Sequence, residues 1–136
     1  MYTTKHNARA KYILKKIDLA LKEYSEKPDY RSLTLEHIFP QNPNKDWDDK
    51  LKEKGSKIVK NPSEYLNRIG NLTLLDIKMN KGASNLYFTE KKNTHYSRST
   101  LNLNLDLNNF DSWDEVEISS RQESLASIAK EIWKIK

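Results

Sequence analysis

Apolar residues recur every three or four positions near each end of the chain, the spacing of a helix that buries one face. Between residues 7 and 25, the apolar positions with this spacing are Ala10, Ile13, Leu14, Ile17, Ala20, Leu21 and Tyr24. Near the other end they are Leu125, Ile128, Ala129, Ile132 and Trp133. We therefore expect a helix over residues 7–25, ending before Pro28, and a last helix that begins at a capping box formed by Ser120 and Glu123.

Two short apolar runs in the middle of the chain predict β-strands. The first extends from Leu33 to Ile38 and stops at Pro40, and the second, N-L-T-L-L, extends from Asn71 to Leu75. Both are short and rich in Leu and β-branched residues, as strands are. We expect them to form a hairpin with a long connection.

The connection itself, residues 41–62, is polar and contains Pro43, Gly55 and Pro62. We expect a short helix near Asp46 to Lys54. A second helical turn should start at Asn61-Pro62, because Asn suits the capping position and Pro the first helical position.

Beyond the second strand, residues 86–96 predict a helix that carries Leu86, Phe88 and Tyr96. Leucines alternate with polar residues between positions 97 and 111, which predicts either a short strand or an extended segment wrapped on the core. The sequence contains no internal repeat and no Gly/Ser-rich linker. The pattern therefore predicts one α+β domain, with a strand–loop–strand–helix centre wrapped by terminal helices.

The residue types that are scarce or missing narrow the possible chemistry. The chain has 136 residues, 36% of them hydrophobic, which suffices for one modest core. It has no cysteine, so disulfides, thiol nucleophiles and thiolate zinc sites are excluded. Three glycines are too few for a phosphate-binding glycine loop. A bound metal would depend on oxygen and histidine ligands, which favours a hard ion such as Mg²⁺ or Mn²⁺.

The net charge of +5 suits a polyanionic partner, although 24 basic against 19 acidic residues is a mild excess. The chain has no run of about 18 apolar residues, so no membrane span is expected. Its first residues lack the apolar core of a signal peptide. The simplest expectation is a cytoplasmic protein.

A carboxylate and a histidine, Glu36 and His37, stand side by side at the end of the first predicted strand, in L-E-H-I-F-P-Q. Neighbouring side chains of a strand point to opposite faces. Near the strand end, the two side chains can still contact opposite sides of one metal–phosphate centre. An isolated pair of this kind is more often an ordinary surface pair, so other residues must decide.

Three asparagines, Asn71, Asn80 and Asn85, surround the second predicted strand. Asn forms helices and strands poorly, so a cluster of this kind needs a reason. Capping and turn formation are a sufficient reason for Asn85. They explain Asn71 less well, because it follows Gly70 and directly precedes the apolar run.

These motifs together resemble a known family. E-H-I-x-P-Q, then G-N-L-T-L-L, then K-x-N-x-x-x-S-N-x-x-F-x-x-K-K cover about Leu33 to Tyr96. In this order they resemble the C-terminal nuclease domain of GmrSD-type restriction systems, which belong to the HNH (His-Me finger) superfamily. The flanking helices, including R-x-x-x-L-A-x-x-A-x-x-I-W, are similar as well. The stretch from Asn71 to Asn80 also resembles the HNH domain of CRISPR effector nucleases, where D-H-I-x-P-Q replaces E-H-I-F-P-Q.

The resemblance implies a ββα-metal core, in which a β-hairpin carries the catalytic histidine and the following helix carries a metal ligand. His37 would be the general base that activates water, a task that suits its ordinary pKa of about 6.5. Asn80 and Glu36 would bind one divalent ion, Mg²⁺ or Mn²⁺, at the scissile phosphate. The superfamily often has Asp or His at these ligand positions, so Glu36 and Asn80 are departures from its pattern.

The remaining roles follow from the same resemblance. Asn71 would orient the histidine or its loop, and Lys91 would stabilise the developing charge on the phosphate. The candidate nucleic-acid contacts are Lys81, Asn85, Lys92 and Arg98. His95 and His6 are expected to have no catalytic role.

The resemblance also sets expectations for organisation and partners. We expect one nuclease domain over residues 1–136, with an N-terminal helix in 1–30, the catalytic core in 31–96 and a C-terminal wrap and helix in 97–136. In the resembled family this domain follows a nucleotide-hydrolysing domain with a D-G-Q-Q-R-type motif, which these residues lack. The chain is therefore expected to be the C-terminal part of a larger protein.

The predicted function is metal-dependent DNA endonuclease activity in the restriction of foreign DNA, modified DNA included, with a homodimer as one assembly to consider. Two alternatives stay open: an inactive module that binds nucleic acid or docks a partner, and a nuclease directed at RNA.

Overall fold

Two short strands form the centre of the protein. A computed structural model of the chain describes residues 4–83 and 85–134; residues 1–3, 84 and 135–136, together with whatever was expected of them, lie outside that description. β1 (Leu33–His37) and β2 (Leu72–Asp76) pair antiparallel, with His37 opposite Leu72. Both predicted strands are confirmed. With the helices around them, they give the α+β class that the sequence predicted.

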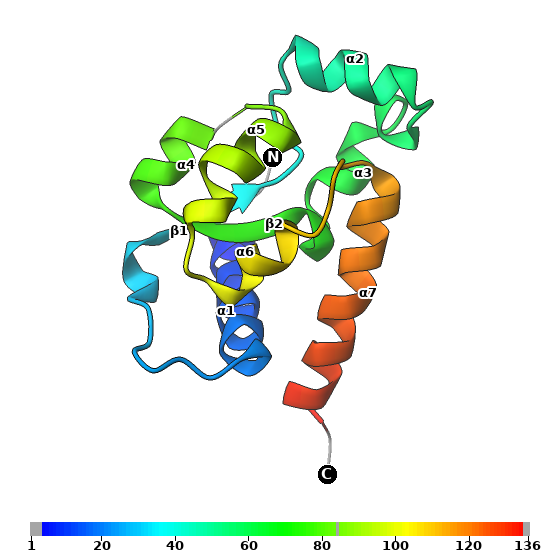
Figure 1. Ribbon diagram of the computed structural model, residues 1–136. Coiled ribbons are helices and arrows are strands. Elements are labelled where there is room, and N and C mark those ends of the chain that lie inside the picture. The colour runs from blue at the N-terminus through cyan, green and yellow to red at the C-terminus, as the bar shows by residue number, and fades with distance from the viewer. Residues whose placement is uncertain (1–3, 84, 135–136) are drawn as a thin grey trace.

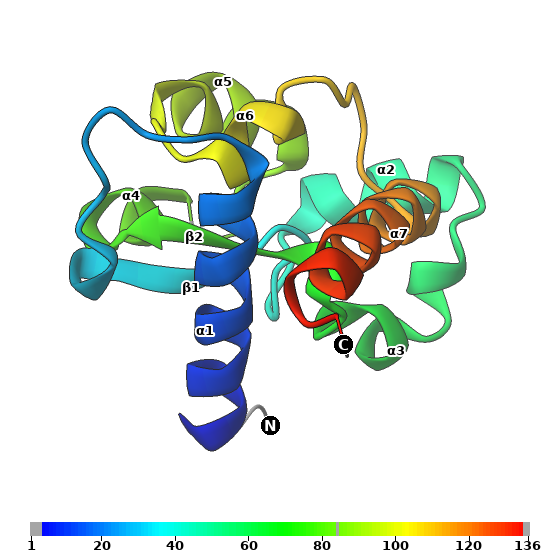
Figure 2. The same ribbon diagram turned by 90° about the horizontal axis from the view of Figure 1, so that it is seen from below.

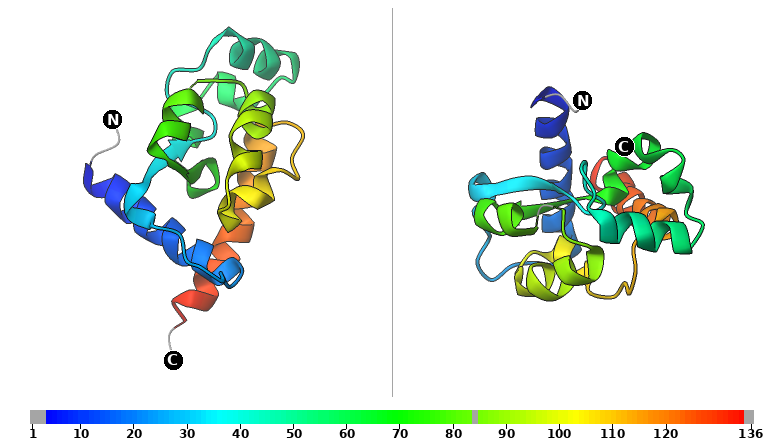
Figure 3. Two further views of the ribbon diagram at one scale, coloured as in Figure 1. Left: turned by 60° about the vertical axis from the view of Figure 1, so that its left-hand side comes forward. Right: turned by 90° about the horizontal axis from the view of Figure 1, so that it is seen from above.

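The connection between the strands folds into short helical segments. These are α2 (Lys45–Glu53), a 3₁₀ turn at Lys57–Val59, α3 (Pro62–Leu66) and a 3₁₀ turn at Ile69–Asn71. Asn44 caps α2 by accepting a hydrogen bond from Trp47 N at 3.2 Å. The predicted helices of this region are both confirmed. Figure 3 shows the connection on the side of the hairpin where the C-terminal helix lies.

α1 (Thr4–Leu21) and α4 (Ile77–Ala83) each contact both strands of the hairpin. α1 lies below the strands in Figure 1, whereas α4 follows β2 directly and lies above them. Figure 2 shows α1 crossing the strands. α1 ends at Leu21, earlier than predicted, and the Asn102 side chain donates there to the carbonyl oxygens of Asp18 and Lys22. No helix within the described residues is long and apolar enough to cross a membrane.

The segment expected to be a strand or an extended wrap is helical instead. After α5 (Phe88–Thr94) and a 3₁₀ turn at Tyr96–Arg98, α6 spans Asn102–Leu107. Leu103 and Leu107, four residues apart, face the core, and Leu105 is exposed. The alternating leucines therefore fit one helical turn as well as a strand. Asn104 settles the choice by donating to Leu74 O at 2.8 Å and accepting from Thr73.

The last helix begins earlier than the predicted Ser120. α7 spans Glu115–Ile132, and its capping box is formed by Asp114 and Glu117. Asp114 Oδ1 accepts from Val116 N at 2.8 Å, and Glu117 accepts from Asp114 N at 3.0 Å. The prediction of a helix is confirmed, but its start was wrong. Both pairs match the capping pattern, and the earlier start is the one that buries Ile118.

α7 packs directly on the turn that leads into β2. A Cβ on Gly70 would lie 2.3 Å from Ile118 O, so only glycine allows this approach. Arg121 donates to Gly70 O at 3.0 Å and to Leu72 O at 2.6 Å, and Gln122 accepts from Gly70 N. The C-terminal helix thus fixes the backbone on both sides of Asn71.

The buried side chains form two clusters. The first, called the aliphatic core, consists of Ala10, Leu14, Ile17, Tyr30, Leu33, Leu72, Leu74, Leu101, Leu103 and Leu125. The second, called the aromatic core, contains Phe39, Trp47, Tyr65, Tyr87, Phe88, Tyr96 and Trp113 with the aliphatic side chains between them. Rings in the aromatic core pack closely, with centroids 4.8 Å apart for Trp47 and Tyr87. The aromatic core supports the loop that leaves β1.

Candidate active site

A polar pocket of about 270 Å³ opens where β1 ends. It is lined by Leu35, Glu36, His37, Pro40, Gln41, Asn42, Asn80 and Asn85. Side chains from the strand, from its exit loop and from α4 therefore meet at one opening. Four of the residues that the sequence singled out, namely Glu36, His37, Asn80 and Asn85, are among them.

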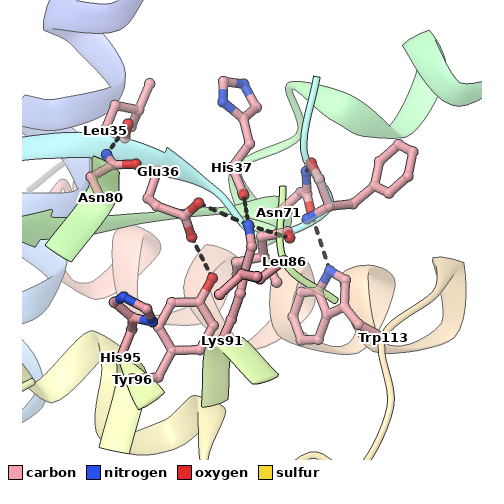
Figure 4. Close-up of polar contacts among 12 residues, drawn as sticks. Leu35, Glu36, His37, Asn71, Asn80, Leu86, Lys91, His95, Tyr96 and Trp113 are labelled. Atoms are coloured by element: carbon pink, nitrogen blue, oxygen red, sulfur yellow. Dashed lines mark hydrogen bonds and ion pairs between the residues drawn. The ribbon is translucent and has the colours of Figure 1, made fainter. Parts of the chain in front are cut away.

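His37, the last residue of β1, is half-buried. Its ring points to the opposite side of the strand from the Glu36 carboxylate, as strand geometry requires (Figure 4). Its Nε2 lies 2.8 Å from Asn67 Oδ1. Burial lowers the pKa of His37 below its ordinary 6.5, although the Asn67 hydrogen bond and the Glu36 charge act in the opposite direction. The imidazole is therefore mainly neutral at pH 7, the state that a general base requires.

Glu36 is buried in an ion pair. Its Oε1 lies 2.9 Å from Lys91 Nζ, and its Oε2 accepts a hydrogen bond from the Tyr96 hydroxyl (Figure 4). Burial raises the pKa of Tyr96, so this hydroxyl keeps its proton and acts as the donor. Each carboxylate oxygen has a second lone pair beyond the one used here. The carboxylate is therefore fixed in position without its ligand capacity being used up.

Lys91 lies beneath the pocket and not on its surface. Its Nζ also donates to His37 O at 2.9 Å and to Ile38 O at 3.0 Å, so all three ammonium hydrogens have acceptors. The side chain is 0% exposed. Burial lowers the pKa of Lys91, and the Glu36 charge opposes that effect. The expected contact between Lys91 and the phosphate does not fit this position. The ammonium instead holds Glu36 and the end of β1 together.

Asn80 belongs to α4 and faces β1. Its Nδ2 donates to Thr34 Oγ1 at 2.8 Å and to Leu35 O at 3.0 Å, so both amide hydrogens are used. The amide oxygen lies on the side of Glu36 in Figure 4. These two hydrogen bonds determine which way the amide faces, and they direct its oxygen toward the carboxylate.

Asn71 is 0% exposed and makes four side-chain hydrogen bonds. Its Oδ1 accepts from Phe39 N at 2.8 Å and from Trp113 Nε1 at 3.0 Å, and its Nδ2 donates to the carbonyl oxygens of Phe39 and Leu66. Because the full capacity of the amide is satisfied inside the protein, Asn71 fixes the loop after β1. This geometry is consistent with the expected role of Asn71 in orienting the loop, and its side-chain amide has no hydrogen-bonding group left for a ligand.

The other candidate contacts are dispersed. Lys81 follows Asn80 in α4 and is exposed, whereas Lys92 donates to Phe110 O at 2.8 Å. Arg98 lines a different depression that also contains Asp29 and Asp76. His95 Nδ1 lies 2.6 Å from Thr94 Oγ1, and its ring packs against Gly82.

Two residues of the site were missed from the sequence: Asn67 and Tyr96. Asn67 stands three residues before Gly70, outside the G-N-L-T-L-L motif that Gly70 opens. Tyr96 was assigned only to a helix face. The one signal in the sequence for Asn67 was that it is an Asn with no part in a predicted helix cap. The sequence offered no signal for a role of Tyr96 in the site.

The donor set fits one particular kind of metal site. Among residues 4–83 and 85–134, no group of three or more His, Cys, Asp or Glu side chains could hold a metal ion. The pocket instead offers one carboxylate, that of Glu36, and side-chain amides, those of Gln41, Asn42, Asn80 and Asn85. Mg²⁺ is typically bound by one or two protein carboxylates, with waters and substrate phosphates completing its octahedron. The residues present fit such an ion.

The family model for GmrSD restriction endonucleases, C-terminal domain, matches residues 1–128. No match was found among the curated proteins. The matched family indicates a restriction-endonuclease role with DNA as the substrate. Because the match covers most of the sequence, the chain belongs to the family of C-terminal domains of GmrSD restriction endonucleases.

Proposed function

We propose that this domain is an HNH-type endonuclease that hydrolyses DNA phosphodiester bonds with the help of one divalent metal ion. The observation that carries the proposal is the shared pocket. It joins His37, Glu36 and Asn80 at one opening although they come from β1 and α4. In the proposed nuclease, β1, β2 and α4 would form the ββα-metal core.

The chemistry assigned to His37 is proton transfer. The neutral imidazole takes a proton from a water molecule as the water oxygen attacks phosphorus. The bond from phosphorus to the 3′ oxygen breaks, and the electron pair leaves with that oxygen. A Mg²⁺ or Mn²⁺ ion held by Glu36 and Asn80 would supply positive charge next to the leaving oxygen.

The buried neighbours act by positioning. Lys91 and Tyr96 fix the Glu36 carboxylate, and Asn71 fixes the loop that follows His37. Lys81 and Asn85 are the candidates for DNA contact nearest to the pocket, and Lys92 and Arg98 would contact the backbone farther away. None of these roles requires a base to be read, which agrees with chemistry directed at the phosphate.

The proposal extends to organisation. Residues 1–136 would form one nuclease domain of a larger cytoplasmic protein, working with a nucleotide-hydrolysing domain or subunit in the restriction of foreign DNA. A homodimer would place two such pockets on one duplex. A single pocket accounts for a nick in one strand.

Cleavage of supercoiled plasmid, with Mg²⁺ or Mn²⁺ present, tests the activity. We expect His37→Ala to lower the cleavage rate by about 10²- to 10⁴-fold, the usual contribution of a general base. His95→Ala is the matched control, since it removes the same side chain outside the pocket, and it should cut like the parent. Thermal unfolding of both variants establishes that they fold.

Two results would contradict the proposal. The first is a His37→Ala variant that cuts as fast as the parent. The second is a parent chain that binds DNA under every divalent ion and cuts none, which would favour the inactive binding module. A parallel assay on a single-stranded RNA of the same sequence decides between DNA and RNA as substrate.

A further inference from the structure

Asn67 is held in place by the residues on both sides of it. It ends α3, where its backbone N–H donates to Tyr65 O. Arg68 pairs with Glu64 at 3.1 Å and stacks over the Tyr65 ring. The Asn67 side chain is half-buried. Its amide therefore extends from a fixed backbone and not from a loose loop.

This amide contacts the imidazole of His37. Asn67 Oδ1 lies 2.8 Å from His37 Nε2, a normal hydrogen-bond length. An amide oxygen only accepts hydrogen bonds, so Nε2 must carry the proton. A neutral imidazole has a single N–H, and its lone pair then resides on Nδ1. The contact selects one of the two tautomers and fixes the direction of the N–H.

The backbone close to each partner of this hydrogen bond is bound by the same buried residue, Asn71. Asn71 binds the backbone of Phe39, two residues after His37, through two side-chain hydrogen bonds. Its Nδ2 also donates at 2.8 Å to the carbonyl oxygen of Leu66, the residue before Asn67. The distance between the strand end and the end of α3 is therefore fixed beneath the pair.

We propose that Asn67 is a positioning residue for the reaction, which holds His37 with Nε2 protonated so that Nδ1 is the atom that accepts the proton of the attacking water. This inference rests on the proposed nuclease function. It assigns Asn67 no contact with DNA or metal. A purely structural Asn67 would stabilise α3 and leave the tautomer of His37 unchanged.

The test compares a variant that removes the hydrogen-bond acceptor at position 67 with a variant that keeps it. Asn67→Leu keeps the approximate volume and removes the acceptor. Asn67→Asp keeps an acceptor oxygen at the same reach. We expect Asn67→Leu to lower kcat on the order of 10- to 100-fold, as loss of an outer-shell orienting partner does, with KM unchanged. Asn67→Asp should keep a kcat near that of the parent at saturating DNA. Ser63→Ala, at an exposed position of the same helix, is the control for a general disturbance of α3.

Nitrogen-15 NMR of the imidazole gives a readout that does not depend on cleavage. At a pH where the ring is neutral, the parent and Asn67→Asp should show His37 protonated at Nε2. Asn67→Leu should show a share of the form protonated at Nδ1. A parent His37 protonated at Nδ1 would overturn the inference.

The two proposals fail in different ways. Loss of the nuclease function appears as the absence of any cleavage that depends on His37. If cleavage does depend on His37 and Asn67→Leu keeps the kcat of the parent, the positioning role alone is rejected.

Discussion

Two of the buried carboxylates, those of Asp18 and Glu36, are held in similar ways, one next to each hydrophobic core. In the aliphatic core, Asp18 accepts from the hydroxyls of Tyr24 and Tyr30 at 2.6 and 2.5 Å and from Leu103 N at 2.9 Å. Beside the aromatic core, Glu36 accepts from Lys91 and from the Tyr96 hydroxyl. Each carboxylate is at most 2% exposed, and each is bound by a tyrosine.

The carboxylates of Asp18 and Glu36 differ in the charge of their hydrogen-bond donors and in whether a pocket lies next to them. The hydrogen bonds of Asp18 join α1 to the segment after it and to α6, and every donor is neutral. Burial, together with Asp18, raises the pKa of Tyr24 and of Tyr30, so both keep their protons. Glu36 pairs with a cation and borders a polar pocket with His37 and Asn80. A buried, hydrogen-bonded carboxylate is thus no sign of a site by itself. Its access to a pocket that holds further ligands distinguishes the two.

The largest expected effect of this difference is on cleavage. Glu36→Gln keeps the shape and removes the charge that would hold the metal, so we expect cleavage to fall by about 10²- to 10³-fold. Asp18→Asn makes the corresponding change in the aliphatic core and should leave the kcat of the folded protein unchanged. Plasmid cleavage measures both. Equal losses in the two variants would show that Glu36, like Asp18, is only structural.

Stability should respond at both places, and more strongly at Glu36. Lys91→Met leaves the Glu36 carboxylate buried without its cation, which costs about 3–5 kcal/mol. Asp18→Asn should cost about 1–3 kcal/mol, because it places an amide hydrogen among groups that are already donors. Urea unfolding measures the two free energies.

A double variant sharpens the stability comparison. Adding Glu36→Leu to Lys91→Met removes the unpaired charge, so it should recover most of the lost free energy of unfolding. If the double variant is less stable than Lys91→Met alone, the ion pair contributes through packing and not through charge.

The smallest expected effect is the response to pH. The pKa of His37 is lowered below 6.5 by burial, so kcat should rise with pH through that depressed pKa and stay level from about pH 6.5 to 8. Keeping His37 neutral also stabilises the fold above the pKa of the unfolded chain, and this contribution is lost as pH falls through the folded pKa. Tyr24 and Tyr30 keep their protons across this range. A pH–rate profile whose acidic limb lies above pH 6.5 would contradict the assignment of His37 as the base.

The sequence by itself determined most of the elements and the main members of the site. Both strands and the terminal helices follow from apolar runs and apolar spacing, because such patterns report relations between residues two to four positions apart. The motifs named His37, Glu36 and Asn80, and the family they resemble is the family to which the chain belongs. The same local patterns gave a wrong prediction at two places. Residues 102–107 fit a strand as well as a helix, and α7 could begin at Asp114 or at Ser120. At both places the observed structure makes a contact with a distant segment.

Only the tertiary structure decided what surrounds the motif residues. The donors to Glu36 lie 55 and 60 residues away, and the partner of the His37 ring lies 30 residues away. The structure also shows that Lys91 is buried and that Asn71 binds the backbone of Phe39 and Leu66. The spacing of apolar residues cannot predict such pairs, because they form only when β1, α3 and α5 pack together. The chemistry of the site could be read from residue types, but its geometry depends on packing between distant segments.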